Sequence, residues 1–159
     1  NNFIGEIIML LRFRAWDKTE NKMWNVETIY IEDEWVKVND GSIYGITKDL
    51  VRDYVLMQST GLKDKNGVEI YEGDIIEFED ESFYYPFDDE AIVEIINRAQ
   101  VIIDKVKGIF LENFMVKDST IAKEYKYYYD LPTSEKTILF KECSVVGNVF
   151  EDENLLEDE

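Results

Sequence analysis

Residues 60–78 read TGLKDKNGVEIYEGDIIEF, a stretch in which turn residues separate short segments of β-type composition. The dipeptide Asn66-Gly67 supplies the positive φ angles that a tight hairpin turn requires. Gly73 marks a second break, and Asp74 beside it is expected to accept hydrogen bonds from nearby backbone N–H groups. Three apolar side chains of the stretch are predicted to be buried: Ile70, Ile75 and Phe78. The stretch therefore predicts closely spaced strands joined by tight turns.

Short strands are also predicted on both sides of this stretch. Apolar and charged residues alternate over residues 10–17, and the segment 23–26 follows a polar turn, so a hairpin is expected there. Further strands are expected over four segments: 28–31, 34–38, 54–59 and 109–114. Residues 137–150 are read as one or two final strands.

Three segments are less regular. Residues 42–53 carry a weak helical pattern in which Thr47 would be the N-cap. Residues 91–104 fit both helical spacing and strand alternation, and their β-branched residues favour a strand that ends at Asp104. Residues 79–90 are interpreted as an acidic, aromatic loop, because Pro86 and the charge density argue against regular structure.

Many short strands, many turns and little helix predict an all-β fold. We expect an N-terminal β-rich part over 9–67, a C-terminal part over 68–150 with a variable region at 79–137, and an acidic tail over 151–159. The even spacing of strands after Gly73 suits a small barrel, because closure removes exposed strand edges. Met9 is followed at once by the run LLRFRAWDK, so residues 1–8 are expected to be an added or upstream extension.

The composition excludes several classes of activity. The chain has 159 residues with 35 acidic and 17 basic side chains, a net charge of −18, which argues against nonspecific binding to nucleic acid or anionic lipid. It contains no histidine, so histidine bases and histidine zinc sites are excluded. Cys143 is the only cysteine, which fits a reducing cytoplasm, and a small buried hydrophobic role is expected for it.

No catalytic, cofactor-binding or metal-binding residue is predicted. The sequence lacks both glycine-rich phosphate-binding motifs, GxxxxGK[ST] and GxGxxG. The segment Asp64-Lys65-Asn66-Gly67 places glycine at the fourth position, whereas a calcium loop needs it at the sixth. Clustered carboxylates leave a metal-dependent hydrolase as the alternative hypothesis, although 35 acidic residues make some close pairs inevitable.

Acidic residues gather in two places. The span 66–97 has eleven acids and no base, and the last nine residues contain six acids. A solvated, solubilising surface explains such composition, and an electrostatic surface for a basic partner is the functional interpretation. Aromatic residues among the acids favour the second interpretation, because exposed aromatics resemble interface anchors. The candidate partner-contact residues here are Phe83, Tyr84, Tyr85, Asp88, Asp89 and Glu90.

The turn at residues 63–65 also has two interpretations. Its residues can serve the hairpin structurally, which is the main expectation. Alternatively, Lys63, Asp64 and Lys65 form an exposed loop that contacts a partner.

Three segments together resemble a known family: LRFRAWDKTENKMW at 11–24, YVLMQSTGLKDKNGVEIYEGDIIEF at 54–78 and VVGNVFEDENLL at 145–156. Their order resembles the YopX-like family of bacteriophage and prophage proteins, over roughly residues 9–78 and 138–156. The resemblance implies a β-rich fold whose C-terminal part is an SH3-type barrel. It also implies a phage-encoded protein that acts inside a bacterium. The family has no established activity, so it implies no catalytic residues.

The resulting hypothesis is a noncatalytic interaction protein in the bacterial cytoplasm, without a cofactor. Its expected partner is a host or phage protein with a basic surface. A DNA-binding protein is one candidate, since an acidic surface can mimic DNA. Direct binding to nucleic acid or to a membrane is not expected.

Overall fold

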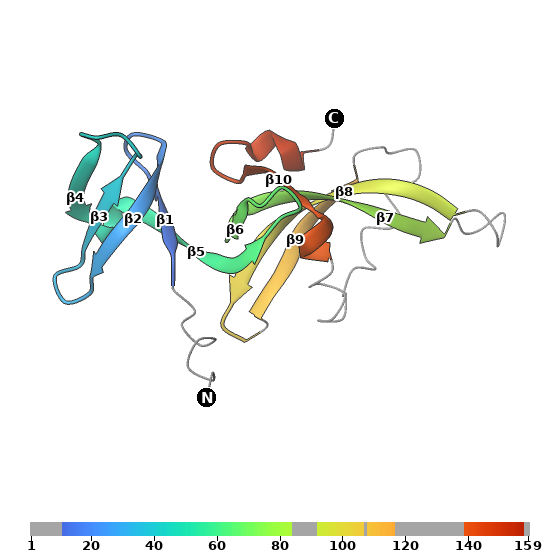
Figure 1. The fold of residues 1–159 in the computed structure, drawn as a ribbon, viewed down its shortest axis with the longest axis horizontal. Coiled ribbons are helices and arrows are strands. Elements are labelled where there is room, and N and C mark those ends of the chain that lie inside the picture. The colour runs from blue at the N-terminus through green and yellow to red at the C-terminus, as the bar shows by residue number, and fades with distance from the viewer. Residues whose placement is uncertain (1–10, 84–91, 107, 117–138, 158–159) are drawn as a thin grey trace. The chain divides into compact units, whose positions relative to one another are not determined.

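The computed structural model describes residues 11–83, 92–106, 108–116 and 139–157. These residues form two antiparallel β-sheets with very little helix, which confirms the predicted all-β class (Figure 1). The chain divides into two compact units, Asn1–Gly61 and Leu62–Glu159, which are described separately below as unit 1 and unit 2.

Unit 1 is built from five consecutive strands: β1 (Phe13–Asp17), β2 (Lys22–Tyr30), β3 (Trp35–Asn39), β4 (Ile46–Leu50) and the first part of β5 (Tyr54–Lys63). The strands pair in the order β4-β3-β2-β1-β5, and a short 3-10 helix, η1 (Val51–Asp53), joins β4 to β5. The predicted hairpin is confirmed as β1 and β2. The segments 23–26 and 28–31 are one strand, β2, which continues through a β-bulge between Val26 and Thr28.

The sheet of unit 1 is strongly curled. In a flat sheet β4 and β5 would lie about 19 Å apart, four spacings of about 4.8 Å each. Three residues of 3-10 helix rise only about 6 Å, so β4 and the start of β5 must approach each other. Val51 N–H donates to the carbonyl of Glu34, 2.8 Å away, and fixes the connection beneath the β2–β3 turn. The core of unit 1 consists of Ala15, Trp24, Val36, Val38 and Tyr54.

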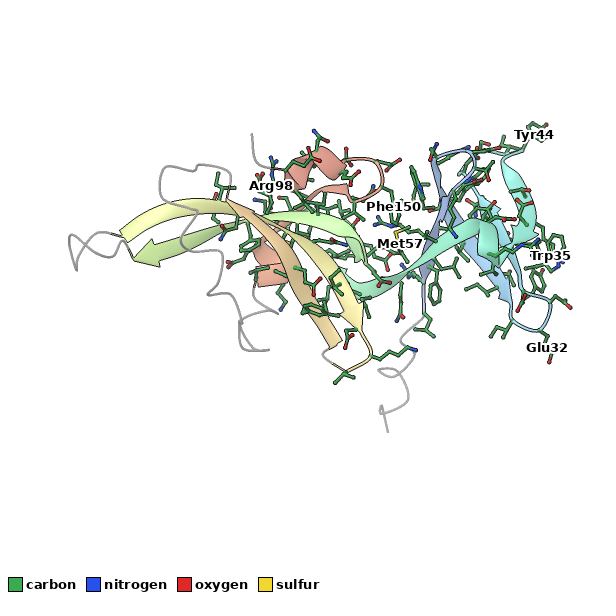
Figure 2. The ribbon with its side chains drawn as sticks, turned by 180° about the vertical axis from the view of Figure 1, so that it is seen from behind. Glu32, Trp35, Tyr44, Met57, Arg98 and Phe150 are labelled. Carbon is green, nitrogen blue, oxygen red and sulfur yellow. The ribbon has the colours of Figure 1, made fainter. Side chains whose placement is uncertain are left out.

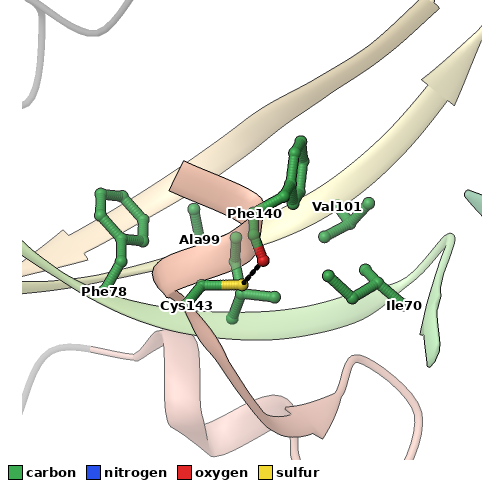
Figure 3. Packing of buried hydrophobic residues seen from close by; sticks show 7 residues of the cluster. Ile70, Phe78, Ala99, Val101, Phe140 and Cys143 are labelled. Atoms are coloured by element: carbon green, nitrogen blue, oxygen red, sulfur yellow. Dashed lines mark hydrogen bonds between the residues drawn. The ribbon is translucent and has the colours of Figure 1, made fainter. Parts of the chain in front are cut away.

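Unit 2 contains the end of β5, the short strand β6 (Glu69–Tyr71) and a second sheet. That sheet has the order β10-β7-β8-β9, formed by β7 (Asp74–Phe83), β8 (Ile92–Asp104), β9 (Gly108–Val116) and β10 (Ser144–Asn148). Its core joins residues of β6, β7 and β8 to the helical turn at 139–142: Ile70, Ile76, Phe78, Ala99, Val101, Phe140 and Cys143 (Figure 3). The predicted burial of Ile70, Ile75 and Phe78 is confirmed.

Some expectations about single elements were wrong. Residues 46–50 form strand β4 rather than a helix, because Val36 and Val38 of β3 provide a partner for a segment too short to be a stable helix alone. Residues 79–83 continue β7 rather than a loop, since β8 pairs with them as far as Phe83. Residues 139–142 are helical rather than extended, and this turn places Phe140 and Cys143 in the core.

Within the described residues neither sheet closes through pairing of its edge strands. The coarse prediction of a small N-terminal sheet followed by a separate β-rich part is thus confirmed, whereas the SH3-type barrel of the C-terminal part is not. A short 3-10 helix, η3 (Glu153–Leu156), follows β10 within the acidic tail.

Candidate interaction surfaces

The turn after β5 is organised around the buried carboxylate of Asp64, which is only 5% exposed. One carboxylate oxygen accepts hydrogen bonds from the backbone N–H groups of Asn66 (2.8 Å) and Val68 (2.9 Å). The other accepts from the N–H of Val145, 2.9 Å away in β10 and 81 residues further along the chain. Gly67 has a φ of +82°, as the predicted turn requires. Asp64 therefore links the β5–β6 turn to the last strand of the sheet.

These contacts give Asp64, the central residue of the candidate loop 63–65, a structural role. Lys63 and Lys65 are exposed on either side of Asp64, and the N–H of Lys65 donates to the carbonyl of Cys143 (3.0 Å). Asp64 itself is turned inward, contrary to the exposed loop of the alternative interpretation. Contact of Lys63 and Lys65 with a partner stays a prediction.

The second turn of the stretch 60–78, at Gly73-Asp74, is also held by a buried aspartate that accepts a backbone hydrogen bond. Asp74 is 1% exposed and accepts a hydrogen bond from the N–H of Tyr71 at 2.7 Å, which confirms the expected role of this aspartate. Gly73, with a φ of +81°, donates to the carbonyl of Val101 and accepts from the N–H of Val149. The two aspartates of the motif are thus explained by backbone hydrogen bonds.

Cys143 is fully buried, and its thiol donates to the carbonyl of Phe140 at 3.3 Å (Figure 3). Burial, together with the negative charge of Asp64, raises the pKa of this thiol to about 12. A thiol with such a pKa is not a nucleophile near neutral pH, so the expected structural role of Cys143 is confirmed.

The most distinctive acidic feature is a two-stranded extension of the second sheet. In the described part of the chain, residues 79–83 of β7 and 92–96 of β8 pair only with each other, since β10 reaches Glu77 and β9 reaches Asn97. The described backbone of this extension carries four acidic residues, Glu79, Asp80, Glu81 and Glu94, and no base. Figure 1 shows β7 and β8 continuing beyond the rest of their sheet. We call residues 79–96 the acidic extension.

The predicted contact residues of the acidic span divide between described and undescribed positions. Phe83 is the last residue of β7 and is opposed by Ile92 in the register. Tyr84, Tyr85, Asp88, Asp89 and Glu90 lie outside the described residues, in the segment that joins β7 to β8.

The negative charge is concentrated in unit 2. Residues 62–159 contain 25 acids and 10 bases, a net charge of −15, whereas residues 1–61 contain 10 acids and 7 bases. Arg98 is the only base between Lys65 and Lys105, and its guanidinium donates to the carboxylate of Glu77 at 3.0 Å. The single positive charge at the base of the acidic extension is therefore already paired.

The sequence analysis missed a second exposed feature, the β3–β4 loop of unit 1. Ile43 is 86% exposed and Tyr44 is 94% exposed, and Ile46 at the start of β4 is 50% exposed. Figure 2 shows Tyr44 pointing away from the sheet at this end of unit 1. The signal that could have found this loop is the run GSIYGIT at 41–47, which is uncharged in a chain where 33% of residues are charged.

Two further chemical possibilities were searched for in the described residues. No three acidic or cysteine side chains among them lie close enough together to hold a metal ion. None of the helices found there has the length and apolar composition needed to cross a membrane.

Comparison with known proteins identifies the family of the chain. Its sequence resembles the protein EF1440 from Enterococcus faecalis, whose crystal structure superimposes with a TM-score of 0.58 at 28% identity. That match covers 93% of this chain and 99% of the other. No curated protein matches. The family profile described as YopX protein matches residues 12–157, which covers most of both units. The chain therefore belongs to the YopX protein family.

Proposed function

We propose that the protein is a noncatalytic interaction module that recognises a basic protein surface through its acidic extension. The observation that carries the proposal is the combination of a protruding two-stranded ribbon with a complete lack of basic residues. Seven acids and no base lie between Glu79 and Glu94. Within the described part of the chain, neither β9 nor β10 pairs with residues 79–83 or 92–96.

The register of the ribbon supports a role other than stability. Glu81 and Glu94 occupy directly opposed positions of β7 and β8. Like charges at opposed positions weaken an antiparallel pair, and an isolated two-stranded ribbon is only marginally stable in water. A basic partner that neutralises these charges would stabilise the ribbon on binding.

The field of the extension would act mainly on the rate of association. At physiological salt the Debye length is about 8 Å, so only a partner at or near contact is strongly attracted. Such a field raises the association rate and selects basic surfaces more than it increases affinity. A DNA-binding protein offers a basic surface that normally meets phosphate, and we propose it as one class of partner.

The proposal also concerns the biological setting of the protein. We propose a phage or prophage origin and action in the bacterial cytoplasm, in line with the resemblance and with the single buried cysteine. The SH3-type arrangement also stays a proposal. It is supported by Leu62 of β5 and Ile70 of β6, which pack on the same core as β7 and β8.

The experiment is affinity capture from a bacterial lysate, followed by binding measurements with the purified captured protein. The bait is the full chain or its variant Asp88→Asn/Asp89→Asn/Glu90→Gln. A matched control, Glu20→Gln/Glu32→Gln/Asp33→Asn, removes three exposed charges from unit 1. The proposal expects a basic protein that binds the control like the wild type and the first variant more weakly.

Two results would contradict the proposal. The first is a captured protein that binds all three baits equally. The second is robust turnover in nuclease, phosphatase or protease assays with magnesium or manganese, lost on substitution of a carboxylate pair. That result would establish the metal-dependent hydrolase, for which the described residues offer no supporting arrangement.

A further inference from the structure

The β3–β4 loop, residues 40–45, holds its shape through hydrogen bonds rather than through apolar packing. The N–H of Asp40 donates to the carbonyl of Gly45 at 2.9 Å and closes the loop. The Asp40 carboxylate accepts from the N–H (3.0 Å) and the hydroxyl (2.7 Å) of Ser42. It also forms an ion pair with Lys22 of β2 at 2.8 Å. The pKa of Asp40 is held far below its usual value by Lys22 and Ser42, so the carboxylate stays charged.

The backbone of the loop adds two further constraints. Gly41 has a φ of +83°, which favours glycine, and its N–H donates to the side-chain oxygen of Asn39 at 3.1 Å. A Cβ atom on Gly45 would overlap the Asp40 carboxyl group, so a larger residue there would displace the carboxylate that shapes the loop. The conformation is therefore specified from both ends of the loop.

This fixed loop carries two large apolar side chains outward. Ile43 and Tyr44 are 86% and 94% exposed, although the neighbouring core residues Val36 and Val38 are fully buried. Rigid, exposed aromatic and aliphatic residues are the usual anchors of protein interfaces, because little conformational entropy is lost when they bind. An arrangement that prevents these side chains from folding back suits recognition better than it suits stability.

We infer that Ile43 and Tyr44 form a preorganised anchor that inserts into an uncharged apolar pocket of a partner protein. Charge complementarity favours this occupant. Residues 41–47 carry no charge, and Asp40, which precedes them, is paired with Lys22. A membrane is a poor alternative, since a chain with a net charge of −18 is repelled by anionic lipid. The anchor lies in unit 1 and is independent of the acidic extension in unit 2.

The test uses the full chain and three variants. Ile43→Ser/Tyr44→Ser removes the anchor. Ile31→Ser/Val106→Ser is the matched control, because these apolar side chains are 84% and 93% exposed at other turns. Asp40→Ala keeps the anchor and removes the acceptor that shapes the loop, and amide hydrogen exchange of residues 41–45 shows whether the loop has loosened.

Proteins captured from a bacterial lysate are purified and titrated against each variant at low salt and at about 1 M salt, where the Debye length is about 3 Å. The inference expects a partner that still binds at high salt and binds the anchor variant roughly 100-fold more weakly. The matched control should bind like the wild type, and Asp40→Ala should bind about tenfold more weakly, with faster exchange in the loop.

Four outcomes would overturn the inference. They are the absence of any protein whose binding depends on Ile43 and Tyr44, an equal loss of binding in the matched control, anchor-dependent binding to neutral phosphatidylcholine vesicles, and anchor-dependent dimerisation in sedimentation equilibrium. The last two would identify a lipid surface or a second copy as the occupant. Neutralisation of Asp88, Asp89 and Glu90 should not change binding through Ile43 and Tyr44. The inference therefore fails or succeeds separately from the proposed function.

Discussion

Replacing Asp64 by alanine should destabilise unit 2 strongly. The substitution removes the acceptor of three backbone N–H groups, those of Asn66, Val68 and Val145. A hydrogen bond to a charged group contributes about 1.5–3 kcal/mol. Asn66 and Val68 are exposed, so their N–H groups regain water in the variant, whereas the bond to Val145 lies deeper. We therefore expect a loss of roughly 3–5 kcal/mol rather than the full sum.

Two further substitutions make the prediction specific. Asp64→Asn keeps one oxygen for the turn but directs an NH₂ donor toward the N–H of Val145, so we expect a loss of about 2 kcal/mol. Asp104→Ala is the control, because the hydrogen bond that the Asp104 carboxylate accepts from the N–H of Val106 is exposed to solvent. The free energy of unfolding of this control should fall by less than about 1 kcal/mol.

The assay is urea unfolding followed with two probes. The thiol of Cys143 is buried in unit 2, so its reaction with a disulfide reagent reports unfolding there. All three tryptophans, Trp16, Trp24 and Trp35, lie in unit 1, so their fluorescence reports the other unit. With a slope of about 2 kcal/mol per molar urea, Asp64→Ala should lower the thiol midpoint by roughly 2 M.

The pH dependence provides a second check. Burial raises the pKa of Asp64, but the hydrogen bonds from Val145, Val68 and Asn66 outweigh this effect and hold the pKa below 3.8. A depressed pKa contributes stability above the unfolded value, and that stability is lost as the pH falls through the folded value. The difference between wild type and Asp64→Ala should be constant from about pH 8 to pH 5 and shrink below about pH 4. Equal thiol midpoints, or a difference that persists unchanged at low pH, would refute the reasoning.

Three other predictions concern single side chains. Tyr54→Phe should cost unit 1 about 1–3 kcal/mol in a tryptophan-monitored urea titration, because the hydroxyl donates to Asp49 at 2.9 Å. Burial and Asp49 raise the pKa of Tyr54, so the stability contributed by its hydroxyl is complete below about pH 10 and is lost at higher pH. A difference in unfolding free energy between wild type and Tyr54→Phe that stays unchanged in alkali would contradict this. Gly45→Ala should destabilise unit 1 by roughly 1–3 kcal/mol through overlap with Asp40, and an unchanged midpoint would show that the loop adapts. Cys143 should react with a thiol reagent only as fast as unit 2 opens, and rapid labelling of the native protein would show that the thiol is accessible.

The strands and turns were predictable where the signal is local. Asn66-Gly67 and Gly73 mark turns in their own residue types, and the structure places both glycines at positive φ. Alternating residues predicted the hairpin of β1 and β2 for the same reason. The role of Asp74 followed from ordinary turn chemistry, because its hydrogen-bond donor, Tyr71, is only three residues away.

The remaining features depend on contacts between distant residues. Strand β4 forms because β3 pairs with it, and its own sequence favours a helix only weakly. The third bond of Asp64 reaches Val145 across 81 residues, which no turn motif can reveal. The sequence did not predict that Ile43 and Tyr44 are exposed, because apolar residues predict burial. The hydrogen bonds of Asp40, which hold the loop, explain why these side chains stay exposed.

The central claim, that the acidic extension recognises a basic protein, is tested most directly by the association rate. Stopped-flow measurements with the captured partner would compare wild type, Asp88→Asn/Asp89→Asn/Glu90→Gln and the matched control Glu20→Gln/Glu32→Gln/Asp33→Asn over a series of salt concentrations. We predict that the rate of the wild type and of the control falls steeply with salt, while the rate of the first variant is lower and falls less steeply with salt, because four acids of the extension remain. Identical rates for all three proteins at every salt concentration would contradict the claim.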